Sequence, residues 1–155
     1  MDMIILYSVC IIIVILLIIF IRKKNLIEAQ ISFLFMQVPT WLFGSLVVKG
    51  GLIEYPVGLL SVVYKASFTF EFFVFPSISA IFNVHFPKGK PWYYKTGYIL
   101  IFPAVMTLIE VYLEKNTELI KYLNWTWYMS FISITLTLLL SYWYYLWFFS
   151  KVTKA

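Results

Sequence analysis

Hydrophobic runs of about twenty residues, separated by short polar connections, recur along the whole chain. A run of this length predicts a transmembrane helix, because about 20 apolar residues cross the hydrocarbon core of a bilayer. Together the runs predict an all-α fold, a polytopic helical bundle of five transmembrane helices in a single membrane domain (1–155). The expected spans are about 3–21, 27–48, 57–82, 96–113 and 125–149.

Composition supports a membrane protein rather than a soluble domain. Hydrophobic residues make up 63% of the 155 positions and charged residues only 12%, against about a quarter in soluble domains. The net charge of +5 does not suggest nucleic-acid binding, because the basic residues lie in short clusters beside the hydrophobic runs. We therefore expect a multi-pass protein whose immediate surroundings are the lipid bilayer.

The basic residues also predict the orientation of the chain. In the five-span arrangement, eight of them fall on one side: Arg22, Lys23, Lys24, Lys88, Lys90, Lys95, Lys151 and Lys154. Three fall on the other side: Lys49, Lys115 and Lys121. The cytoplasmic side carries the excess of lysine and arginine in most membrane proteins, which predicts an N-terminus outside and a C-terminus inside.

Three prolines lie within the expected spans, at Pro39, Pro76 and Pro103. Proline lacks an amide hydrogen and crowds the carbonyl four residues earlier, so each is expected to mark a bend or a local break. Gln37 and Thr40 are plausible donors to the carbonyl that Pro39 frees. A four-span arrangement, with the second or fourth segment re-entrant at its proline, is the main alternative.

The third segment is the one around which the others are expected to pack, because it holds Lys65 and Glu71 within the crossing. A charge at mid-membrane costs about 2.5–3.5 kcal/mol on insertion scales. Six residues of α-helix separate the two by roughly 120° around the axis and about 9 Å along it. They therefore face different neighbours rather than each other.

Depth in the membrane suggests partners for these charges. Glu71 is expected to lie level with Gln37, and Lys65 level with Glu110. In the structural interpretation, Lys65 and Glu110 form a buried pair, and Gln37 or a tyrosine hydrogen-bonds Glu71. In the functional interpretation, the same groups form a path for protons or ions. A row of hydroxyls in the fifth segment has the same two interpretations, close helix packing or a polar lining: Ser130, Ser133, Thr137 and Ser141.

A small polar group is expected at the inner membrane interface, formed by Asn83, His85 and Tyr93. It is the only support for a lipid-modifying enzyme, and an interfacial hydrogen bond explains His85 equally well. The sequence contains one histidine and no recognisable catalytic or phosphate-binding motif. We accordingly predict no catalytic residues, no metal site and no cofactor.

Several short aromatic motifs resemble a known family: Trp41-x-x-Gly44, Tyr55-Pro56-x-Gly58, the phenylalanine-rich run through Phe75-Pro76, and Phe86-Pro87-Lys88. The chain from about Trp41 to Phe149 is similar to small, uncharacterised multi-span membrane proteins of spore-forming low-GC Gram-positive bacteria. The resemblance implies a bacterial plasma membrane and no assigned activity.

Two functions follow as expectations. The first is a non-enzymatic component of the envelope or spore membrane, acting through a membrane-protein partner or as a homo-oligomer, because no extramembrane domain is predicted. The alternative is a small ion-coupled transporter or carrier that uses Lys65, Glu71 and Glu110 within the membrane.

Overall fold

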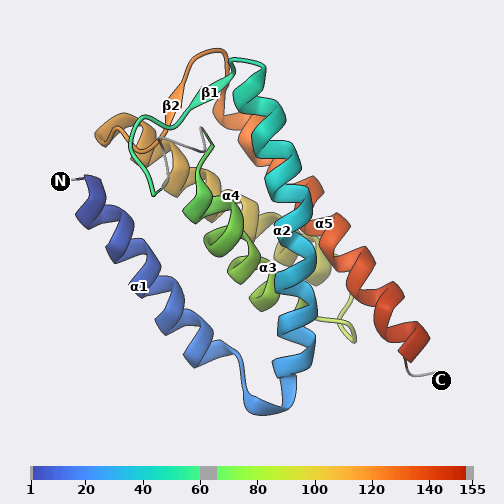
Figure 1. Ribbon diagram of the computed structural model, residues 1–155. Coiled ribbons are helices and arrows are strands. Elements are labelled where there is room, and N and C mark those ends of the chain that lie inside the picture. The colour runs from blue at the N-terminus through green and yellow to red at the C-terminus, as the bar shows by residue number, and fades with distance from the viewer. Residues whose placement is uncertain (1, 60–65, 153–155) are drawn as a thin grey trace.

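Four long helices form the frame of the protein, as seen in a computed structural model that describes residues 2–59 and 66–152 (Figure 1). All four are long and apolar enough to cross a membrane, so the chain is a helical membrane protein. Their bounds lie close to the expected spans: α1 Asp2–Phe20, α2 Leu26–Lys49, α4 Trp92–Asn116 and α5 Trp127–Val152.

The third segment differs from the continuous helix expected over 57–82. Its described residues 57–59 lie in a bend, and the helical part consists of a π-turn, η2 (Phe70–Val74), followed by α3 (Phe75–Val84). The Ser67 hydroxyl accepts a hydrogen bond from the amide of Phe70 at 3.4 Å, which favours a helix start at this point. The fifteen residues Phe70–Val84 measure about 22 Å along the axis, less than the bilayer core.

The two prolines of the four-span alternative do not interrupt their helices. Pro39 lies inside α2, which has 24 residues, and Pro103 lies inside α4, which has 25. The departure from α-helical geometry occurs instead in the turn before Pro76. The segment with the shortened helix is therefore the third and not the second or fourth.

The bundle has two distinct ends, and the termini lie at opposite ones (Figure 1). At the amino-terminal end, β1 (Ile53–Glu54) pairs antiparallel with β2 (Lys121–Tyr122), and the Asp2 carboxylate accepts a hydrogen bond from the amide of Glu118 at 3.3 Å. At the other end a short 3₁₀ turn, η1 (Lys23–Asn25), joins α1 to α2. Successive helices consequently alternate in direction.

The short α3 lies at the centre of the bundle, where it packs against α1, α2 and α5 (Figure 1). The side chain of Phe82 is fully buried, and four aromatic rings surround it from the loop after α3, from α4 and from α5. Contacts with α1, α2, α4 and α5 cover this short and irregular helix, as backbone at membrane depth requires.

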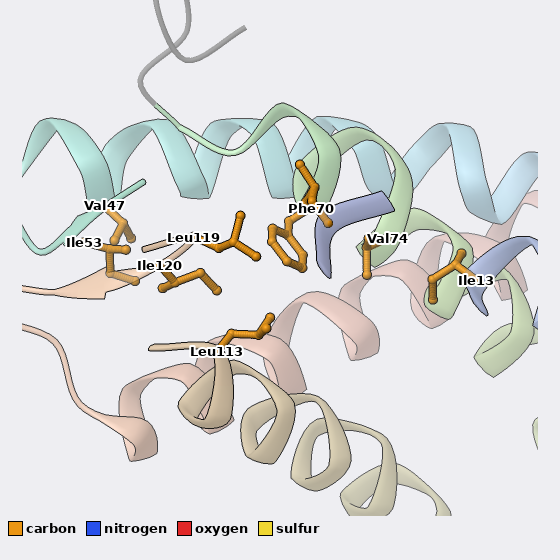
Figure 2. Close-up of a cluster of buried hydrophobic side chains, with 9 residues drawn as sticks. Ile13, Val47, Ile53, Phe70, Val74, Leu113, Leu119 and Ile120 are labelled. Carbon is orange, nitrogen blue, oxygen red and sulfur yellow. The ribbon is translucent and has the colours of Figure 1, made fainter. Parts of the chain in front are cut away.

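A second hydrophobic cluster lies toward the amino-terminal end, where the two strand-forming loops meet the helices (Figure 2). Loop residues Leu119 and Ile120 lie beside Phe70 of η2, and Leu113 of α4 lies opposite them. Ile13 of α1 belongs to the same cluster. This cluster anchors α1 to η2 and α3, whereas the middle of α1 faces α4 across a cavity.

Candidate binding cavities

The irregular turn before Pro76 is stabilised by side chains of α2. Pro76 has no amide hydrogen, so the turn that precedes it is short of donors for its carbonyl oxygens. Gln37 Nε2 donates to the carbonyl of Phe72 at 2.9 Å, and Thr40 Oγ1 lies 2.8 Å from the carbonyl of Glu71. The sequence suggested these two side chains as donors within their own helix. In the structure, Gln37 donates to the neighbouring helix, and Thr40 Oγ1 lies within hydrogen-bond distance of carbonyls in both helices.

Glu71 lies deep in the bundle, with only 3% of its surface exposed. Its side chain occupies the space above Gly44 of α2, where an added Cβ would lie 1.8 Å from Glu71 Oε1. Gln37, one of its expected partners, donates to the backbone of Phe72 and not to the Glu71 carboxylate. Gly44 therefore provides the room that the carboxylate needs.

Glu110 of α4 is held by a hydrogen-bond network at the amino-terminal end. Its Oε1 atom accepts hydrogen bonds from Tyr122 Oη and Ser130 Oγ, each at 2.7 Å. Trp125 Nε1 donates to Ser130 Oγ at 2.7 Å. Burial, and then the negative charge of Glu110, raises the pKa of Tyr122, so its hydroxyl remains a protonated donor at neutral pH. This network fixes the carboxylate through Oε1. No hydrogen bond between the described residues involves Oε2.

A small cavity of about 60 Å³ has both carboxylates in its wall, and we call it the polar cavity after the carboxylates and hydroxyls in its otherwise apolar lining. Both Glu71 and Glu110 line it, although they belong to different helices. Its other polar lining comes from Thr40 of α2 and from three hydroxyls of α5: Ser130, Ser133 and Thr137. A polar cavity of this size can hold a few water molecules. The hydroxyl row of α5 therefore contributes to a lining as well as to helix packing.

A much larger cavity of about 680 Å³ lies between α1, α3 and α4, and its walls are almost entirely aliphatic and aromatic. Its lining on α4 extends from Ile101 to Leu113, a distance of about 18 Å along the helix. Glu110 and Tyr55 line both this cavity and the small polar one. The large cavity, called the chamber from here on, is therefore an elongated apolar space that is partly open at the protein surface and has a carboxylate near one end.

The other sequence-predicted residues that the structure describes lie outside the linings of both cavities. Lys65 is outside the described residues, so its expected pairing with Glu110 is not addressed. Asn83 is fully buried and donates to Ser141 Oγ at 3.0 Å. The ring of His85 is exposed and lies 3.1 Å from the carbonyl of Ile81. No hydrogen bond or ring contact of the described residues joins Tyr93 to Asn83 or His85.

One polar contact at the opposite end was not anticipated from the sequence. The Tyr145 hydroxyl donates to Glu28, and Lys88 Nζ donates to Tyr145 Oη at 2.9 Å. A carboxylate in the first turn of a span, level with the tyrosines of the last span, could have suggested it. Within the described residues, no group of three or more histidine, cysteine, aspartate or glutamate side chains is placed to hold a metal ion.

Comparison with known proteins does not add a family to this description. No family model matches the chain, and no curated protein or solved structure shows significant similarity to it. Any functional assignment consequently depends on the geometry of the two cavities and on the physical chemistry of their linings.

Proposed function

We propose that the protein is a non-enzymatic component of a bacterial plasma or spore membrane that binds a membrane-resident, apolar partner molecule in the cavity between α1, α3 and α4. The observation that supports this proposal is the 680 Å³ chamber itself. Its volume lies within the range of about 300–1,000 Å³ that is usual for small-molecule sites. An apolar lining inside a membrane favours a hydrocarbon chain over a water-soluble substrate.

The way in which α1 is attached supports a binding role. At one end, the Asp2 carboxylate contacts the amide of Glu118. At the other, the rings of Phe20 and His85 meet edge to face with centroids 5.8 Å apart. Between these contacts, α1 forms one wall of the chamber. Because α1 also packs against η2 and α3, with Leu6 and Ile13 buried, its wall of the chamber is already in place for a bound chain.

The proposed topology has five crossings, with the N-terminus outside and the C-terminus inside. It is supported by the alternating helix directions and by seven described basic residues at the C-terminal end against three at the other. In a Cys10→Ser background, we expect an impermeant thiol reagent to label Asn116→Cys in intact cells and to spare Gly89→Cys. Labelling at 89 before permeabilisation would contradict this orientation.

Binding in the chamber can be tested with a photoreactive dodecanol and the full-length protein in phosphatidylcholine nanodiscs. We expect cross-links to the cavity-lining residues of α1, α3 and α4, and competition by excess dodecanol. Val105→Trp should reduce labelling several-fold, because Val105 lines the chamber. Leu108→Trp is the matched control, since Leu108 is on the same helix, 70% exposed and absent from the lining. Equal labelling of both variants would refute the proposal.

An ion-coupled carrier is the second candidate, favoured by the presence of Glu71 and Glu110 in one cavity. The two functions predict different results when the protein is placed in sealed proteoliposomes with an imposed pH gradient. A binding protein leaves the pH gradient unchanged when dodecanol is added. A carrier dissipates the pH gradient, and Glu71→Gln prevents this dissipation. A ligand-dependent, Glu71-dependent collapse of the gradient would replace the first proposal by the second.

A further inference from the structure

Glu110 lies at the junction of the two cavities, and its position indicates which kind of head group a ligand would have. Most of the chamber lining is apolar, yet this carboxylate lies at its amino-terminal end and also faces the small polar cavity. Tyr122 and Ser130 both donate to Oε1. Such an arrangement holds the carboxylate in a fixed position beside the end of the apolar chamber.

We infer that the ligand is a single-chain amphiphile with a cationic, hydrogen-bond-donating head, of which a primary alkylammonium is the simplest example. This inference rests on the proposed function and specifies the chemical class of its ligand. The chain occupies the chamber along α4, and the ammonium group lies at Glu110. The extended length of a dodecyl chain is comparable with the cavity lining on α4.

Charge complementarity selects the cationic head. Among the described residues that line the chamber, Glu110 carries a carboxylate and none carries a basic side chain. A carboxylate head, such as that of a fatty acid, would be repelled by the Glu110 carboxylate in a medium of low polarity. The rings of Tyr55 and Trp125 also line the polar cavity, and aromatic rings favour ammonium groups.

The experiment compares three photoreactive probes that differ only in the head group: dodecylamine, dodecanol and dodecanoic acid. Each is added at pH 7 to the full-length protein in phosphatidylcholine nanodiscs, and labelling is normalised to the amount of probe in the disc. We expect the amine to label the chamber about tenfold more than the alcohol, and the acid to label it least.

Two matched variants test the role of the carboxylate. Glu110→Gln should abolish the preference for the amine and leave labelling by the alcohol intact, because the shape of the site is retained. Glu114→Gln removes a charge one turn further along α4, outside both cavity linings, and should leave the preference unchanged.

The outcomes separate this inference from the proposed function. Strong labelling by the alcohol without any preference for the amine would overturn the inference alone. So would an amine preference that persists in Glu110→Gln, or one that is lost equally in Glu114→Gln. Absence of labelling by all three probes would overturn the proposed function as well.

Discussion

Replacement of Gly44 by alanine is expected to destabilise the folded protein by about 1–3 kcal/mol, the usual cost of overpacking a core. The new Cβ would lie 1.8 Å from Oε1 and 2.6 Å from Cδ of Glu71, closer than atoms can approach. The close contacts extend back along the side chain to Cγ at 3.3 Å, so rotation of the carboxylate within the small cavity does not relieve them. The loss would be measured as the folded fraction during titration with a denaturing detergent.

Two further variants make this expectation specific. Gly97→Ala changes a helical glycine of α4 whose Cβ would meet nothing within 4 Å, so it should be neutral or stabilise by up to about 1 kcal/mol. The double variant Gly44→Ala with Glu71→Ala removes the atoms that clash and should show a favourable coupling energy. A double variant whose losses are simply additive would show that the two side chains do not compete for space.

Truncation of Phe82 to alanine is expected to cost about 2–3 kcal/mol, most of it from the cavity left behind. In a bilayer the transfer of the side chain from water contributes little, because lipid is as apolar as the core. The rings of Tyr98 and Phe102 lie with centroids 5.2 Å from that of Phe82, and they would lose this contact. Loss of the near-ultraviolet circular dichroism signal should accompany the loss of stability.

The control for this truncation is Leu108→Ala on the lipid-facing side of α4, where the side chain is 70% exposed. It should change stability by no more than about 0.5 kcal/mol. Phe82→Leu, which keeps most of the volume, should retain much of the wild-type stability. Equal effects of Phe82→Ala and Leu108→Ala would mean that the aromatic cluster around α3 does not hold the bundle together.

The long helices could be predicted from the sequence because hydrophobic length alone determines them. The short helix of the third segment could not be predicted in this way, because its apolar run is also long enough for a complete transmembrane helix. What shortens the helix is local: a serine at position 67 that accepts from the amide of Phe70, and a proline at position 76. These signals are weak in isolation, and their effect depends on Gln37 and Thr40 of another helix.

The candidate site was predicted in part. The sequence singled out Glu71 and Glu110 because a carboxylate within a hydrophobic segment is costly. It could not show that both face one cavity, since this depends on how α2, α4 and α5 pack. The role of Tyr122 depends on the pairing of β1 with β2, two strands of two residues each. Pairing of such short strands leaves no periodic pattern in the sequence.

The polar contacts of α3 have a consequence for the order in which the protein is made. Gln37 and Thr40 are synthesised before the carbonyls of η2 that they satisfy, so the π-turn has its partners as soon as it leaves the ribosome. Ser79 and Asn83 can form their hydrogen bonds with Ser141 only after Ser141 has been synthesised, and it lies 58 residues after Asn83. Until α5 is made, these buried groups of α3 lack this partner. A chain that stops before α5 would therefore present quality-control proteases with an exposed polar face in the membrane.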